Sequence, residues 1–92
     1  MVLTQATLAA QQIWAAYVYQ AMARAVYETL PDDGTVYAEI PGFQGVWANE
    51  PTFDACRAEL LSVLEDWLMV RLKEGLDLPA VPGTPSPTAL PS

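Results

Sequence analysis

Five carboxylates in the middle of the chain are the residues best suited to chemistry. They are Glu28, Asp32, Asp33, Glu39 and Glu50. Carboxylates that converge on one point can hold the paired divalent cations of a two-metal nuclease. Two interpretations need no metal, because the same side chains can be simply solvated or can bind a basic partner. Asp32 and Asp33 fall in a Pro-Asp-Asp-Gly sequence, where aspartate is common for reasons of turn geometry alone.

Few other residues of the types used in catalysis are present in the sequence. The sequence contains no histidine, which removes the commonest general base and the usual metal ligand. Cys56 is the only cysteine, so no disulfide can form within the chain. It lies on the apolar stripe of a predicted helix with no base beside it, which argues against a nucleophilic role. We therefore expect a protein that is not an enzyme and that needs no metal or other cofactor.

The charge balance argues against direct binding of nucleic acid. Four basic residues stand against 11 acidic ones, for a net charge of -7. This charge repels phosphate backbones and favours either a basic partner or plain solubility. The three tryptophans and four tyrosines are not interleaved with Arg or Lys, so we interpret them as core and interface aromatics rather than as base-stacking platforms.

The N-terminal stretch is apolar without being a signal peptide or a membrane span. Residues 8–22 lack a preceding basic region and are interrupted by Gln11, Gln12 and Gln20. A single cysteine also suits a reducing compartment, so we expect a cytoplasmic protein. The absence of Lys and Arg before Arg24 disfavours a helix lying on a membrane surface, so no membrane partner is expected.

A helix over residues 1–22 would be apolar around much of its circumference and must bury itself, on its own domain or on another chain. One side of it carries Ile13, Trp14, Tyr17 and Val18. We expect these residues to form an oligomer or packing interface. With only 92 residues the domain buries a modest share of its surface, so self-association as a dimer or tetramer would help to stabilise it.

Three strands should follow as an antiparallel meander. The first is expected at residues 24–30, the second at 35–40 and the third at 46–48, with a hairpin turn at 31–34. In the second strand Val36, Ala38 and Ile40 alternate with Tyr37 and Glu39, which predicts one buried face and one partly wet face.

A long helix is predicted after Thr52, which can cap its first turn, and it should run to about Glu74. The apolar stripe that would lie on the sheet consists of Phe53, Cys56, Leu60, Val63, Leu64, Trp67 and Val70. Leu61, Leu68 and Leu72 widen this stripe, which indicates either oligomerisation or packing against the N-terminal helix. Residues 76–81 are spaced to add an edge strand, with Pro79 acceptable only at an edge.

The order of these elements resembles the HicB-like antitoxin family. The residues that carry the resemblance are Val26-Tyr27-Glu28, Pro31-Asp32-Asp33-Gly34, Tyr37-Ala38-Glu39-Ile40-Pro41-Gly42, Gly45-Val46, Thr52 and Gly75. The similarity covers about residues 23 to 83 and is strongest to a short, cyanobacterial-type subgroup. It implies an α+β fold, specifically a partial RNase H-like βββαβ domain with an additional N-terminal helix.

The resulting organisation has three parts. We expect an N-terminal helical extension at residues 1–22, a HicB-like domain at 23–81 and a Pro-rich disordered tail at 82–92. Residues 83–92 are too few for the C-terminal DNA-binding module that family members often carry, so repression of an operon by this chain is not expected.

The resemblance also implies a function. HicB-like antitoxins bind and neutralise a small, basic, mRNA-cleaving HicA-type ribonuclease toxin, and an acidic chain is suited to mask such a partner. The five carboxylates named above would then form the partner-binding surface. The alternative is a solitary HicB-like structural or adaptor protein that self-associates or binds another protein and has no toxin partner.

Overall fold

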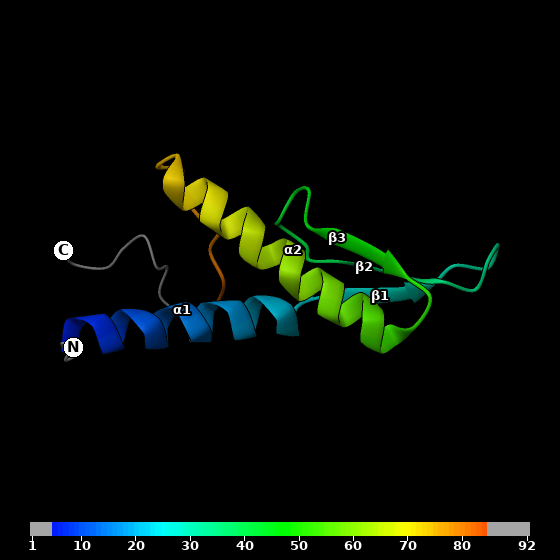
Figure 1. Cartoon of the computed structure of the whole chain (residues 1–92), viewed down its shortest axis with the longest axis horizontal. Helices are drawn as coiled ribbons and strands as arrows, with labels where there is room; N and C mark the ends of the chain where they lie inside the picture. The colour runs from blue at the N-terminus through cyan, green and yellow to red at the C-terminus, as the bar shows by residue number, and fades with distance from the viewer. Residues whose placement is uncertain (1–4, 85–92) are drawn as a thin grey trace.

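The computed structural model describes residues 5–84, with side chains from residue 12 onward. The elements in chain order are α1 (Gln5–Ala23), β1 (Val26–Thr29), β2 (Val36–Glu39), β3 (Trp47–Glu50) and α2 (Phe53–Lys73). Figure 1 shows α1 running almost directly into β1, while α2 crosses diagonally over the sheet. The arrangement is α+β, as predicted from the sequence.

The sheet is an antiparallel meander in the order β1-β2-β3. At the β1–β2 turn the amide of Leu30 donates to the carbonyl of Thr35 over 2.8 Å, and Gly34 has a φ of 72°, which suits a residue without Cβ. The Oδ1 atom of Asp33 accepts hydrogen bonds from both the amide and the hydroxyl of Thr35, at 3.0 and 2.7 Å. Turn geometry therefore accounts for this aspartate.

The inner face of the sheet is the one that α2 covers. Ala38 of β2 pairs with Ala48 of β3, and both are buried, as is Ile40 just after β2. Two alanines at the centre let the helix approach closely, and the Cys56 thiol donates to the Ala48 carbonyl over 3.6 Å. The predicted alternation of buried and wet residues along β2 is confirmed, because Glu39 is exposed.

Helix α2 begins and ends where its residue types favour it. The Thr52 hydroxyl accepts a hydrogen bond from the amide of Ala55 over 3.1 Å, so the predicted cap is confirmed. The fully buried side chains recur every four residues, and they are Cys56, Leu60, Leu64 and Leu68. Phe53 and Val70 were predicted on this stripe but are 50% and 53% exposed. Phe53 is the first residue of α2 and packs on Tyr27 of β1 with only part of its ring, whereas Val70 lies on another side of the helix from the buried series.

The last turns of α1 belong to the same core as the sheet and α2. Tyr17, Val18, Ala21 and Met22 are buried in one cluster with the leucines of α2. Their spacing of three and four places them along one side of the helix. The Tyr17 ring also lies near Phe43, with 6.2 Å between ring centroids.

The predicted edge strand at residues 76–81 is wrong, since the described part of this segment has no strand structure. Leu78 and Val81 are buried, but the backbone of the segment accepts its hydrogen bonds from side chains rather than from a neighbouring strand. The hydroxyl of Tyr17 donates to the carbonyl of Pro79, and Arg71 donates twice to the carbonyl of Asp77, at 3.0 and 2.8 Å. Figure 1 shows the segment returning between the end of α2 and α1 rather than joining the sheet. Pro79 has no backbone N–H, so it cannot donate a hydrogen bond to a neighbouring strand.

The disordered tail was predicted over residues 82–92. Residues 82–84 form a turn, in which the amide of Thr84 donates to the carbonyl of Val81 over 3.3 Å, and residues 85–92 lie outside the described residues. In the part of the chain that the structure describes, neither helix is both long and apolar enough to cross a membrane.

Candidate partner-binding site

The face of the sheet opposite α2 has no covering element among the described residues. The strand registers place two rows of side chains on it, Val26–Glu39–Trp47 and Glu28–Tyr37–Asn49. These six residues are called the outer sheet face. Residues that pair across strands project to the same side, and the neighbouring positions Ala38 and Ala48 point to the buried side.

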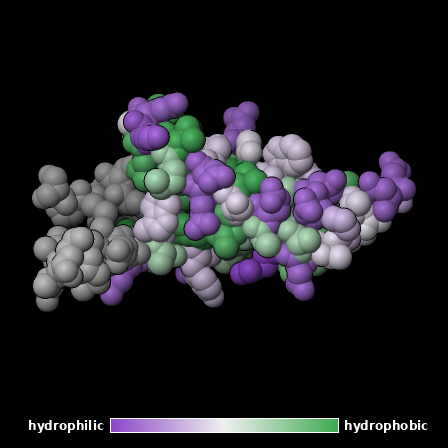
Figure 2. All heavy atoms as spheres, in the orientation of Figure 1, coloured by the Kyte–Doolittle hydropathy of each residue, from purple (hydrophilic) through white to green (hydrophobic). Residues whose placement is uncertain are grey.

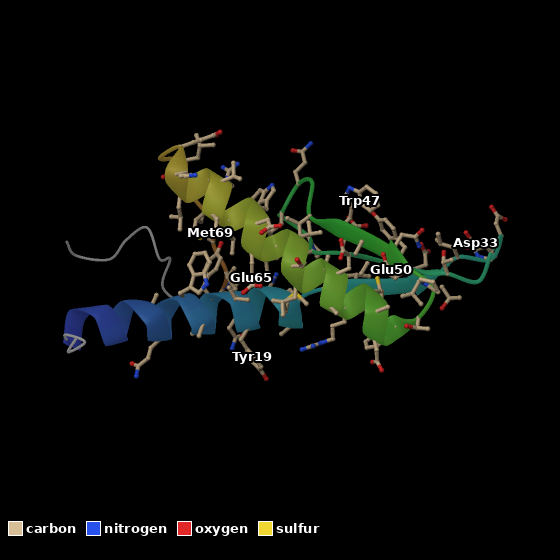
Figure 3. All side chains as sticks on the ribbon, viewed as in Figure 1. Tyr19, Asp33, Trp47, Glu50, Glu65 and Met69 are labelled. Carbon is tan, nitrogen blue, oxygen red and sulfur yellow. The ribbon has the colours of Figure 1, made fainter. Side chains whose placement is uncertain are left out.

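A stacked aromatic pair, exposed Trp47 and half-buried Tyr37, occupies the β2–β3 side of the outer sheet face. The rings of Tyr37 and Trp47 are stacked, with 6.1 Å between centroids and 24° between planes. Trp47 is 54% exposed and Val26 is 55% exposed, although both are large apolar residues on a regular strand. Figure 3 shows Trp47 on β3, away from the helices. Such apolar side chains commonly mark a binding surface.

Two carboxylates flank this apolar surface. Glu39 pairs with both Val26 and Trp47, while Glu28 lies opposite Tyr37, and both glutamates are exposed. None of the four basic residues of the chain, Arg24, Arg57, Arg71 and Lys73, belongs to the outer sheet face. The face therefore combines an aromatic pair, of which Trp47 is exposed, with side-chain charges that are all negative.

The loop between β2 and β3 closes one end of the outer sheet face. A shallow depression of ≈ 390 Å³ lies between this loop and the aromatic pair, and Glu39 is among its lining residues. Gly42 and Gly45 have φ values of 87° and 95°, and Phe43 between them is buried. The Phe43 ring packs on Trp67 at 5.5 Å, so the loop is anchored in the core. The depression is thus held in shape by packing.

The structure does not bring the five predicted acidic residues onto one face. Glu28 and Glu39 share the outer sheet face but do not pair with each other, because the register sets Glu28 opposite Tyr37 and Glu39 opposite Val26. Glu50 pairs with Val36 and so projects toward the opposite side. Asp32 and Asp33 lie in the β1–β2 turn.

The β1–β2 turn forms a separate hydrophilic end of the molecule. Figure 3 shows Asp33 at the far tip, and Figure 2 shows hydrophilic side chains gathered at that end. Hydrogen bonds from the amide and hydroxyl of Thr35 hold the pKa of Asp33 below its usual value. The turn is tied to β3 by Asn49, whose side-chain amide donates to Thr35 and to the Val36 carbonyl, each at 2.9 Å.

The Cys56 thiol, the remaining side chain that could act in catalysis, is used in packing. Burial raises the pKa of the Cys56 thiol, which is fully buried against β3. Among the described residues, no three acidic or cysteine side chains are grouped so that they could hold a metal ion.

The predicted interface residues divide into two groups. Tyr17, Val18 and Leu68 are buried within the chain itself. Ile13, Trp14 and Leu61 are half-buried and Leu72 is 36% exposed, so these four remain at the surface.

Sequence reasoning missed Val26, Tyr37 and Trp47 as site residues. The signal was present, because Tyr37 alternates with the buried positions of β2 and so falls on the open face of the strand. The position of Trp47 beside Tyr37 depends on the β2–β3 register, which the sequence alone does not define.

The fold and this surface define a small α+β domain with one open, acidic and aromatic sheet face suited to binding another protein. Residues 16–79 match the model of the UPF0150-like family, and the chain belongs to that family. The match begins inside α1, earlier than the boundary predicted at residue 23. Membership of this family is consistent with the HicB-like resemblance of the sequence.

A solved structure supports the same fold. The crystal structure of TTHA0281 from Thermus thermophilus is similar over 78% of this chain and 89% of that chain, at 37% sequence identity and a TM-score of 0.72. No curated protein matches the chain.

Proposed function

We propose that the chain is a HicB-like antitoxin that neutralises a small basic ribonuclease of the HicA type by masking it. In this role it acts in the cytoplasm without catalysis, and its meander and α2 serve as a partial RNase H-like binding domain. The observation that carries the proposal is the outer sheet face, where exposed Trp47 stacks on half-buried Tyr37 between carboxylates. Membership of the UPF0150-like family supports it.

The chemistry of the outer sheet face fits a cationic surface. An arginine side chain can stack on Trp47 or Tyr37 while Glu39 accepts hydrogen bonds from its guanidinium group. Aromatic side chains at the centre of an interface commonly supply much of its binding energy. The net charge of -7 adds long-range attraction to a basic protein and competes with RNA for the same positive surface. Masking follows because the bound antitoxin occupies the surface that RNA needs.

The test uses a HicA-type ribonuclease from the same genome, with binding measured by calorimetry and inhibition measured by cleavage of an RNA substrate. Trp47→Ala should weaken binding about 30-fold, which corresponds to the ~2 kcal/mol of an aromatic hot-spot residue. The double variant Glu28→Arg/Glu39→Arg should weaken it by at least about tenfold.

A charge-matched control is Asp66→Arg/Glu74→Arg, which changes two exposed acids on α2 and near its end while leaving the outer sheet face intact. This control should bind almost as tightly as the parent protein. If the outer-face variants inhibit the ribonuclease as well as the parent protein does, the proposed surface is wrong.

A second candidate function is favoured by the apolar surface between α1 and α2, where Trp14 and Leu61 are half-buried and Tyr19 is 71% exposed. A solitary adaptor or structural protein would use that surface and leave the outer sheet face for a partner other than a ribonuclease. Failure of the parent protein to bind any HicA-type ribonuclease would favour this second function.

A further inference from the structure

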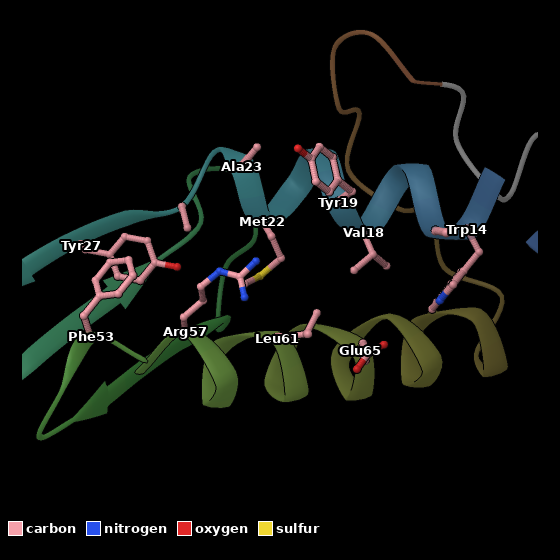
Figure 4. A pocket seen from close by; sticks show the side chains of 12 residues that line it. Trp14, Val18, Tyr19, Met22, Ala23, Tyr27, Phe53, Arg57, Leu61 and Glu65 are labelled. Atoms are coloured by element: carbon pink, nitrogen blue, oxygen red, sulfur yellow. The ribbon is translucent and has the colours of Figure 1, made fainter. Parts of the chain in front are cut away.

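An elongated groove runs between α1 and α2 and reaches β1, on the side of the sheet that α2 covers. Its volume is ≈ 550 Å³. Figure 4 shows Trp14 of α1 near one end of the groove and Tyr27 of β1 near the other. The residues of α2 that line it follow one another at intervals of four positions, and they are Phe53, Arg57, Leu61 and Glu65. This space is called the strand–helix groove.

The strand at the end of the groove, β1, is an edge strand of the described sheet. The amide of Leu30 donates to the carbonyl of Thr35, which makes these residues a hydrogen-bonded pair between the two arms of the hairpin. Hydrogen-bonded and non-hydrogen-bonded pairs alternate along an antiparallel ladder. The backbone N–H and C=O groups of Tyr27 and Thr29 therefore point away from β2. An open strand edge of this kind can pair with an extended segment of another chain.

The free edge of β1 and the strand–helix groove form one continuous path. Because α1 runs almost directly into β1 (Figure 1), a chain that pairs with β1 continues alongside α1. Ala23 and Ala25 line the path where the helix passes into the strand, and their small side chains leave room for it. Figure 4 also shows that α2 runs in the opposite direction to α1 and β1.

The spacing of the groove residues on α2 matches that of alternate residues in an extended chain. Four residues of a helix rise about 6 Å, and side chains on one face of a strand lie about 6.6 Å apart. An extended peptide beside β1 therefore presents its inward side chains, one after another, to Phe53, Arg57, Leu61 and Glu65. The first and third contacts are apolar, the second is with a cation and the fourth is with an anion.

We propose that the strand–helix groove binds an extended peptide segment of another protein, which joins the sheet as a fourth strand antiparallel to β1. Its inward side chains, at every second position from the N-terminus, are apolar, acidic, apolar and basic. The acidic side chain pairs with Arg57. The basic one pairs with Glu65 at the end of the groove where Trp14 lies, and an aromatic ring beside a carboxylate suits a cation.

Both charged residues of the groove are available for this peptide. Arg57 and Glu65 are exposed, and within the described part of the chain neither has an ion-pair partner. The apolar contacts are available as well, because Phe53 is 50% exposed where its ring packs on Tyr27, and Leu61 is half-buried. A peptide with the stated order covers these apolar groups while it pairs both charges.

Charge complementarity selects a segment of a different protein as the occupant. None of the 11 acidic residues of this chain is followed four positions later by Arg or Lys, so a second copy does not offer the required order. The chain's own residues 85–92 contain no charged side chain. The outer sheet face lies on the other side of the sheet, so this inference does not depend on a ribonuclease. It names the partner class that the adaptor function would require.

The first test titrates an acetylated and amidated peptide, Thr-Thr-Val-Thr-Glu-Thr-Leu-Thr-Lys, into the full chain by calorimetry with no ribonuclease present. Its third residue falls opposite Tyr27, and its fifth and ninth residues face Arg57 and Glu65. We expect one peptide to bind per chain with a micromolar dissociation constant. A peptide in which Glu and Lys are exchanged has the same composition and should bind at least about tenfold more weakly.

A reciprocal exchange in the protein should reverse this preference. Arg57→Glu/Glu65→Arg should bind the exchanged peptide at least about tenfold more tightly than the original one. The control is Lys73→Glu/Glu74→Lys, which exchanges two exposed charges at the end of α2 outside the groove and should keep the parent preference. A variant that has misfolded cannot acquire the opposite preference, and circular dichroism shows whether each variant is folded.

Methylation of the peptide backbone tests whether the peptide binds as a strand. An N-methyl group on the third peptide residue removes the N–H that donates to the Tyr27 carbonyl, so the dissociation constant should rise at least about tenfold. The N–H of the fourth peptide residue points away from β1. Methylation there is the matched control and should change the affinity by less than about threefold.

Three results would overturn the proposal. One is the absence of binding of the original peptide at millimolar concentration. The second is equal binding of the original and exchanged peptides by the parent protein. The third is equal binding of the two N-methylated peptides, which would show that β1 does not pair with the peptide. None of these measurements involves the ribonuclease, so their failure is distinct from failure of the proposed antitoxin function.

Discussion

Replacing Tyr17 by Phe tests how the segment at residues 76–81 is held to the core. The Tyr17 ring is fully buried and its hydroxyl donates to the Pro79 carbonyl, 62 positions along the chain. Phenylalanine keeps the ring and its contact with Phe43 but leaves this carbonyl without its donor. The cost of an unpaired part-buried polar group is about 1–3 kcal/mol, so we expect the free energy of unfolding at neutral pH to fall by about 1–2 kcal/mol.

The pH dependence of the Tyr17→Phe variant gives a second, independent result. Burial raises the pKa of Tyr17 to about 12 from its ordinary value of 10.0, against a smaller lowering effect of the Arg71 charge. Because the folded-state pKa is the higher one, the contribution to stability is complete below pH 10 and is lost as the pH rises toward 12. We expect a loss of about 1–2 kcal/mol over this range, after discounting the full shift for solvent screening.

The assay is urea denaturation followed by circular dichroism, in steps from neutral pH to about pH 12. The parent protein should lose stability steeply above pH 10, and Tyr17→Phe should lose less. Burial also raises the pKa of Tyr27, so part of the alkaline slope should remain in the variant. Tyr19→Phe is the control, because Tyr19 is 71% exposed. An alkaline slope in Tyr17→Phe as steep as that of the parent protein would refute the reasoning.

Two further predictions concern α2. Thr52→Ala should lower the free energy of unfolding by about 1 kcal/mol through loss of the N-cap hydrogen bond to Ala55, whereas Thr52→Ser should retain most of it, as chemical denaturation would show. The Cys56 thiol is fully buried and burial raises its pKa, so a thiol reagent should label it only as fast as the protein opens. Labelling in native buffer as fast as in urea would contradict its placement in the core.

The sequence was informative wherever local chemistry decides structure. The Thr52 hydroxyl accepts a hydrogen bond from the amide of Ala55 in the first turn of the same helix. In the Pro-Asp-Asp-Gly turn, Asp33 accepts one from the amide of Thr35, only two residues further on. The alternation around Ala38 fixes which side of β2 is buried. These elements could therefore be predicted without knowledge of the rest of the molecule.

Features that depend on distant partners could not be predicted in the same way. The spacing of Leu78 and Val81 fits a strand, but bonds from Tyr17 and Arg71 hold their backbone elsewhere. Glu50 is close to Glu39 in sequence, yet the β3 register turns it to the other side of the sheet. The aromatic pair of the candidate site has the same origin, since it joins side chains from two strands whose alignment is set by an anchored loop.

The bond between Tyr17 and Pro79 also has a consequence for protein synthesis. A ribosome makes α1 first, but the side chains that complete the core around it, Leu78 and Val81, come only at the end of the described chain. Until they leave the exit tunnel, the apolar side of α1 stays accessible to chaperones and proteases. A nascent chain interrupted before Leu78 would leave this side of α1 uncovered, so the core of the described chain is completed last by the segment at residues 76–81.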